Sequence, residues 1–204
     1  MQLSGRGVIH DALRRVGELL AVDGDPLAVA IIGGAALNLL HIIERPTVDV
    51  DILAFADARE GRVPSPESLR PPPEPMPERL RRAAAQVGRD AGLPANWLNT
   101  GPALQWRAGL PPGLATRVAW LQFGGLWVGL VDRRDLIFFK LFAAADAVGP
   151  RSVHYQDLLK LRPNAAELTA AATWVRTQDA AAVFGQVLDR VVALCRADLA
   201  LGGD

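Results

Sequence analysis

Residues 31–53 read IIGGAALNLLHIIERPTVDVDIL, and this stretch decides the fold. The apolar run Leu27 to Ile32 leads into it and is typical of a short buried strand. Gly33-Gly34 follow at once, and residues 35–41 have the composition of a short helix. Glu44-Arg45-Pro46-Thr47 ends that helix, because the residue before a proline is rarely helical. The stretch therefore predicts a strand, a glycine turn and a helix, followed by a second strand.

The second predicted strand, Val48 to Phe55, begins with alternating apolar and acidic residues. Asp49 and Asp51 are two residues apart, so a strand places both carboxylates on one face. Two negative charges at such a short distance repel each other, and a divalent cation relieves the repulsion. The spacing therefore predicts that Asp49 and Asp51 hold Mg²⁺ or Mn²⁺. Glycines at a strand-to-helix junction let the backbone approach phosphate, which adds Gly33 and Gly34 to the predicted site.

The order Gly33-Gly34, then Arg45-x-Thr47-x-Asp49-x-Asp51, resembles the minimal nucleotidyltransferases of the polymerase-β-like superfamily. It looks most like the AbiEii and MenT toxin group and its uncharacterised bacterial relatives. That group also carries a lysine on an apolar helix and an aspartate further downstream. Lys140 in LIFFKLFAAAD and Asp157 in HYQDLLKL match these two positions. The resemblance covers one short stretch in each half of the chain.

The resemblance implies an α/β fold, α+β in stricter terms, with a small mixed sheet and a helical C-terminal part. It implies transfer of a nucleoside monophosphate from a nucleoside triphosphate, with Mg²⁺, to a hydroxyl of a tRNA 3′ end or a protein side chain. It also implies a place in a toxin–antitoxin system, with an antitoxin protein as partner. The site roles that follow from it are metal ligation by Asp49 and Asp51, phosphate contact by Gly33, Gly34 and Arg45, charge neutralisation by Lys140, and a base or auxiliary carboxylate at Asp157.

Two features depart from the family pattern. Gly34 stands where the toxins often carry serine, so a hydroxyl that could touch phosphate is absent. Many superfamily members carry a third carboxylate on a later strand, whereas the hairpin strands predicted at 117–123 and 126–131 contain no acidic residue. Either Asp157 supplies that carboxylate or the site uses two carboxylates only.

Lys140 is also unusual by composition, because the 22 basic residues include only two lysines, a bias typical of a GC-rich bacterial genome. Its neighbours on the predicted helix 133–147 are apolar, and an unpaired buried ammonium is costly. The side chain must extend to solvent or meet a negative partner. A triphosphate or the Asp49 and Asp51 pair would serve.

The predicted organisation is a nucleotidyltransferase-like core at 1–131 and a helical part at 132–204 that completes a cleft. Seven prolines between Pro64 and Pro77 indicate an exposed, partly extended insertion at about 57–77. Residues 97–113 show no regular pattern. The C-terminal part predicts helices near 154–162, 164–177 and 179–200.

Composition excludes several classes of protein. The chain has 204 residues, half of them apolar, and no formal net charge, which argues against coating nucleic acid through bulk charge. The single cysteine, Cys195, excludes an intramolecular disulfide. We expect a cytoplasmic protein, since there is neither a long apolar run nor the pattern of a signal peptide.

Two alternatives to the enzyme remain. One is a scaffold of the same fold that binds a nucleotide or a partner without turnover. The other is an antitoxin-like interaction protein that uses residues 57–77 for recognition.

Overall fold

The computed structural model describes residues 5–22, 24–147 and 151–201. The chain divides into two compact units. The first, here called the sheet unit, contains residues 1–107 and 113–132. The second, the helical unit, contains residues 108–112 and 133–204.

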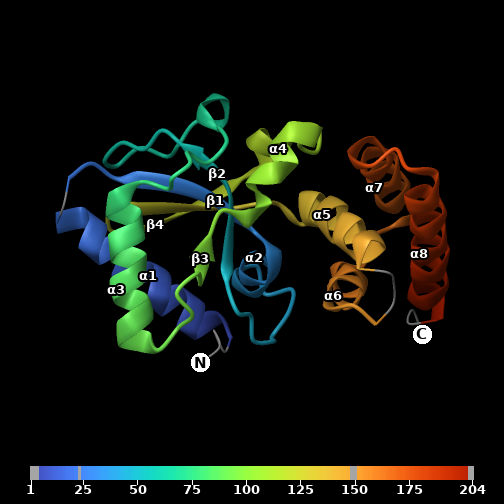
Figure 1. Ribbon diagram of the computed structural model, residues 1–204, viewed down its shortest axis with the longest axis horizontal. Coiled ribbons are helices and arrows are strands. Elements are labelled where there is room, and N and C mark those ends of the chain that lie inside the picture. Colours follow the sequence, from blue (N-terminus) through green and yellow to red (C-terminus); the bar gives the residue numbers. More distant parts are fainter. Residues whose placement is uncertain (1–4, 23, 148–150, 202–204) are drawn as a thin grey trace. The chain divides into compact units, whose positions relative to one another are not determined.

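The sheet unit is built on a five-stranded mixed sheet of order β3-β2-β1-β5-β4 (Figure 1). The central strand β1 (Leu27–Ile32) runs antiparallel to β2 (Val50–Ala56) and parallel to β5 (Leu126–Leu130). The outer strands are β3 (Leu98–Asn99), parallel to β2, and β4 (Ala119–Phe123), antiparallel to β5. The fold is therefore α+β with a small mixed sheet, as the sequence predicts.

Helices and a loop segment cover the two faces of this sheet. Helix α1 (Arg6–Val22) packs against β4, β5 and α3 (Glu78–Ala91), and Figure 1 shows α1 and α3 side by side on one face. On the opposite face, Trp127 forms a small apolar cluster with Ala28 and Ala56, and Leu69 packs against it. Cover on both faces explains why β1 and β5 are almost wholly apolar.

The contact between α1 and the β4–β5 hairpin is a contact between backbones. The Gly125 N–H donates to the Gly17 carbonyl oxygen at 2.8 Å. A Cβ on Gly17 would overlap the carbonyl oxygen of Phe123. Glycine at this position therefore lets the helix lie directly on the hairpin.

The proline-rich segment is less free than its composition predicts. Phe55 and Arg70 exchange two backbone hydrogen bonds of 2.9 Å each, which fasten the segment to β2. The Ser68 hydroxyl accepts a hydrogen bond from the Asp57 N–H at 3.2 Å. The single turn η1 (Pro66–Ser68) ends at the second of these attachments.

The remaining elements of the sheet unit are short. They are α2 (Gly33–Leu39), η2 (Gly101–Leu104), α4 (Gln105–Ala108), which ends at the boundary of the unit, and η3 (Leu114–Arg117). The stretch 97–113, which lacks a regular pattern in the sequence, thus contains β3, η2 and α4. No described helix has the length and apolar character needed to cross a membrane.

The helical unit is arranged around one apolar helix. That helix, α5, contacts the three others, and the four bounds are α5 (Arg133–Asp146), α6 (Val153–Leu161), α7 (Ala165–Gln178) and α8 (Ala182–Leu201). The Ser152 side chain caps α6, and a capping box of Asn164 and Glu167 starts α7. Arg133 donates to the carbonyls of Leu161 and Arg162 and so satisfies the end of α6.

Candidate functional site

The predicted glycines lie where β1 passes directly into α2. Gly33 has φ +76°, a conformation that favours glycine, and it is the first residue of α2. Ile32, just before it, is the register partner of Asp51 on β2. The sheet therefore places Asp51 beside Gly33, as the sequence predicts for one of the two carboxylates.

Both glycines are closely approached by polar side chains. A Cβ on Gly33 would overlap the Asp51 Oδ2 atom, and a Cβ on Gly34 would lie 2.8 Å from Thr47 Oγ1. The Arg45 guanidinium is also near, at 3.6 Å from the same hypothetical atom on Gly34. The absence of side chains at Gly33 and Gly34 is thus what lets a carboxylate, a hydroxyl and a guanidinium gather at this end of β1.

Asp49 lies outside the strand that the sequence predicts for it. Strand β2 begins at Val50 rather than Val48, because the chain is still turning after Pro46, and the Thr47 hydroxyl donates to the Asp49 carbonyl at 3.3 Å. The prediction that one strand carries both aspartates is therefore wrong, because only Asp51 lies in β2. The Asp49 side chain is half-buried, and its carboxylate has no hydrogen-bond or ion-pair partner among the described residues.

Asn38 fastens the loop that carries Arg45 to the start of α2. Its Nδ2 donates to the Gly34 carbonyl at 2.9 Å and to the Arg45 carbonyl at 3.0 Å. The side chain is buried, with 1% of its surface exposed, and Asn38 Oδ1 has no hydrogen-bond partner in the described part of the chain. This amide holds together the two segments that the sequence predicts to contact phosphate.

Asn99 is a site residue that the sequence analysis missed. It is the register partner of Asp51 on β3, and its Nδ2 donates to Asp51 Oδ1 at 3.1 Å. The sequence gives little sign of a strand at Asn99, because β3 has only two residues and therefore no alternation of apolar and polar side chains. Its existence depends on pairing with β2.

The carboxylates near Gly33 can be compared with the ligands that Mg²⁺ needs. No group of three or more His, Cys, Asp or Glu side chains among the described residues could hold a metal. Asp49 and Asp51 offer carboxylate oxygens, and Mg²⁺ commonly binds one or two carboxylates together with phosphate oxygens and water. Within the described residues, Asp49 and Asp51 alone are therefore too few to complete the coordination of such an ion.

Lys140 and Asp157, the other two predicted site residues, belong to the helical unit. The Lys140 ammonium lies 2.8 Å from Asp157 Oδ2, and the two side chains are 6% and 2% exposed. The negative partner that the apolar surroundings of Lys140 require is therefore Asp157, which joins α5 to α6.

A second buried polar contact in the helical unit links α6 to α8. The Tyr155 hydroxyl donates to Asp198 Oδ2 at 2.7 Å, and burial, followed by the bond to Asp198, raises the tyrosine pKa. Burial and the charge of Asp198 also raise the pKa of the Cys195 thiol to about 11. Both groups stay protonated at neutral pH, so this contact has the character of helix packing.

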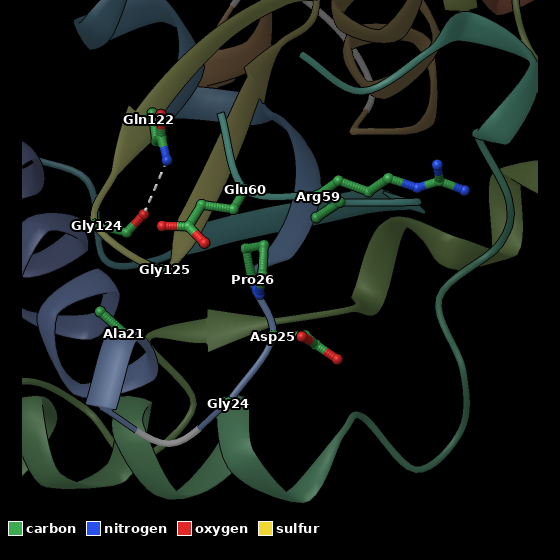
Figure 2. A pocket seen from close by; sticks show the side chains of 10 residues that line it. Ala21, Gly24, Asp25, Pro26, Arg59, Glu60, Gln122, Gly124 and Gly125 are labelled. Carbon is green, nitrogen blue, oxygen red and sulfur yellow. Dashed lines mark hydrogen bonds between the residues drawn. The ribbon is translucent and has the colours of Figure 1, made fainter. Parts of the chain in front are cut away.

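A cavity of about 680 Å³ lies at the opposite end of the central strands from Gly33 (Figure 2). Pro26, just before β1, and Ala58, just after β2, line it together with the turn of the β4–β5 hairpin. In Figure 2 the Glu60 carboxylate points toward this hairpin, while the Arg59 side chain extends away from it. None of the predicted site residues lines this cavity.

Comparison with protein families, curated proteins and solved structures gives no match to this chain. Its function is therefore inferred from the site geometry and from the motif resemblance.

Proposed function

We propose that this protein is a nucleotidyltransferase that moves a nucleoside monophosphate from a nucleoside triphosphate to a hydroxyl acceptor. The observation that carries the proposal is the placement of the Asp51 carboxylate directly over Gly33, at the junction of β1 and α2. A carboxylate this close to side-chain-free backbone suits a metal-bound phosphate better than an ordinary strand face does.

Asp49 and Asp51 are the proposed ligands of Mg²⁺ or Mn²⁺, which, when bound, neutralises phosphate charge. The half-buried Arg45 guanidinium, close to Gly34, is proposed to contact a phosphate of the triphosphate. Asn38 holds this arginine's backbone in place through the Arg45 carbonyl. These residues come from one continuous segment, so the sheet unit alone supplies the proposed phosphate contacts.

In the proposed reaction, the acceptor hydroxyl oxygen forms a bond to the α-phosphorus. The bond from that phosphorus to the bridging oxygen breaks, and pyrophosphate leaves with the electron pair. The hydroxyl proton passes to a carboxylate base. The resemblance assigns this base or auxiliary role to Asp157 and charge neutralisation to Lys140, and it is also the source of the proposed acceptors, a tRNA 3′ end or a protein side chain in a toxin–antitoxin system.

The test is transfer of label from each of the four α-³²P nucleoside triphosphates, with Mg²⁺, to total tRNA and to protein. We expect label in one acceptor class, and a loss of about 100-fold or more in the Asp51→Asn variant, because metal-borne charge stabilisation is worth several kcal/mol. Asp25→Asn is the matched control, since Asp25 lines the cavity at the other end of the strands. Equal transfer by wild type and Asp51→Asn would contradict the proposal.

One observation favours the scaffold alternative. Asn99, not a third carboxylate, is the register partner of Asp51 on the neighbouring strand. Nucleotide binding that depends on Asp51, without transfer to any acceptor, would identify the protein as a nucleotide-binding scaffold of the same fold.

A further inference from the structure

Asn99 lies on β3, which pairs with β2 on the edge away from β1, and contacts with α3 fix its position. The Val50 N–H donates to the Trp97 carbonyl at 2.6 Å, which starts the pairing of β2 with β3. Trp97 is buried, and its indole N–H donates to the Ala84 carbonyl of α3 at 2.9 Å. A buried aromatic anchor therefore sets the register that brings Asn99 to Asp51.

The orientation of the Asn99 amide follows from its second hydrogen bond. Asn99 Oδ1 accepts from the Gly101 N–H at 2.8 Å, and a backbone N–H can only donate. The Nδ2 group must therefore face the other way, where it donates to Asp51 Oδ1. Reversing the amide would place NH₂ against the Gly101 N–H and a carbonyl oxygen against a carboxylate.

Both ends of the amide are thus committed. Its oxygen faces Gly101 and its NH₂ group faces Asp51, so Asn99 turns a donor, which cannot ligate a cation, toward that carboxylate. Its N–H restricts rotation of the Asp51 carboxylate by bonding one of the two carboxylate oxygens. An aspartate at the same position would instead place a second negative charge against Asp51.

We propose that Asn99 is the positioning residue of Asp51, and that its donated N–H limits the protein's cation ligands at this site to Asp49 and Asp51. The inference rests on the proposed function, because it takes Asp51 as a cation ligand. The inference adds that β3 presents the Asn99 N–H donor at the position where a third cation ligand could lie.

The test is titration of the full chain with Mn²⁺, followed by the electron paramagnetic resonance signal of the free ion. Asn99→Leu removes the donor, and we expect Mn²⁺ affinity to fall about 10-fold to 100-fold, as is usual when a metal ligand loses its orienting partner. Asn99→Asp keeps an acceptor for Gly101 but adds a third carboxylate, and we expect affinity to rise, since affinity follows ligand charge. Asn96→Leu, at an exposed asparagine three residues earlier, is the control and should match wild type.

If Asn99 had only a structural role, its two substitutions would not shift the Mn²⁺ affinity in opposite directions. If both variants bind more weakly, or both bind as wild type does, Asn99 does not position Asp51 and the inference is wrong. If wild type binds Mn²⁺ and Asp51→Asn does not, the proposed function survives that result. If wild type shows no Mn²⁺ binding that depends on Asp51, this inference is wrong, whereas the transfer assay decides the proposed function separately.

Discussion

The two units use an aspartate in opposite ways. In the sheet unit, Asp51 is half-buried, receives an N–H from Asn99 and lies over a glycine. In the helical unit, Asp157 is 2% exposed and paired with a lysine that is almost as buried. The bond from Asn99 to Asp51 is a hydrogen bond from a neutral amide, whereas the contact between Lys140 and Asp157 joins two opposite charges.

The two contacts therefore differ in chemistry: one is a hydrogen bond between two strands, and the other is a buried ion pair between two helices. Asp51 and Asn99 are half-buried, so their hydrogen bond lies closer to solvent than the ion pair of the helical unit does. The Lys140 and Asp157 pair is balanced, and such a buried pair repays its desolvation only while both partners remain. Removing one partner should therefore have very different consequences in the two units.

The largest effect is expected from breaking the buried pair. Lys140→Ala removes the ammonium that pairs with the buried Asp157 carboxylate, and we expect a loss of about 3–5 kcal/mol in the free energy of unfolding. Urea denaturation followed by circular dichroism measures it. The double variant Lys140→Met/Asp157→Leu should regain most of the loss, and its transfer activity then reports any catalytic role apart from stability. A single variant as stable as wild type would show that the pair is not coupled to folding.

The next effect tests the backbone contact of the sheet unit. Gly17→Ala places a methyl group on the Phe123 carbonyl, and we expect destabilisation of about 1–3 kcal/mol because α1 must move off the hairpin. Gly7→Ala in the same helix is the matched control, since nothing lies within 4 Å of its added Cβ. That variant should be unchanged or slightly more stable by thermal melting. Equal melting temperatures for the two variants would contradict the close approach.

Gly33→Ala tests the close approach of Asp51 to the backbone at the candidate site. The positive φ of Gly33 costs alanine about 1–2 kcal/mol, and the new methyl group displaces the Asp51 carboxylate. We expect a modest loss of stability together with loss of Mn²⁺ binding. Thermal melting with and without Mn²⁺ measures both, and unchanged Mn²⁺ binding would separate Gly33 from the site.

A smaller effect is expected at Asn38. Asn38→Leu leaves the Gly34 and Arg45 carbonyls without their donor, at a cost of about 1 kcal/mol after the unpaired Oδ1 is also removed. Loosening of the Arg45 loop should weaken triphosphate binding more than it lowers the melting temperature. Calorimetric titration with a non-hydrolysable triphosphate measures the binding, and wild-type affinity in the variant would contradict the role given to Asn38.

The smallest change concerns Cys195 in the helical unit. With a pKa of about 11, very little of the thiol is ionised at pH 8, and the side chain is buried. We expect it to react with a disulfide reagent more than about 100-fold more slowly in the native protein than in guanidinium chloride. The rate should rise with pH up to about 11 as the thiolate forms. Equal rates in the two conditions would show that α8 opens readily.

Local chemistry in the sequence was enough to predict much of the sheet unit. The run Leu27 to Ile32 is apolar throughout, and the glycines that follow it allow the turn into α2. Asp51 lies within an alternating segment, so its neighbourhood with Gly33 follows once two strands of that length pair. Periodicity and glycine chemistry act over a few residues, and sequence patterns report such effects directly.

Three features were decided only by the tertiary structure. Strand β2 starts at Val50, which leaves Asp49 outside it, because the turn after Pro46, with its hydrogen bond from Thr47 to Asp49, extends to that point. Asn99 meets Asp51 across 48 positions of sequence, through a two-residue strand that exists only by pairing. Lys140 takes Asp157 as its partner because packing of α5 on α6 buries both. The sequence can indicate that a buried charge needs a partner of opposite charge. Which distant residue becomes that partner depends on strand register and helix packing, which are properties of the folded chain.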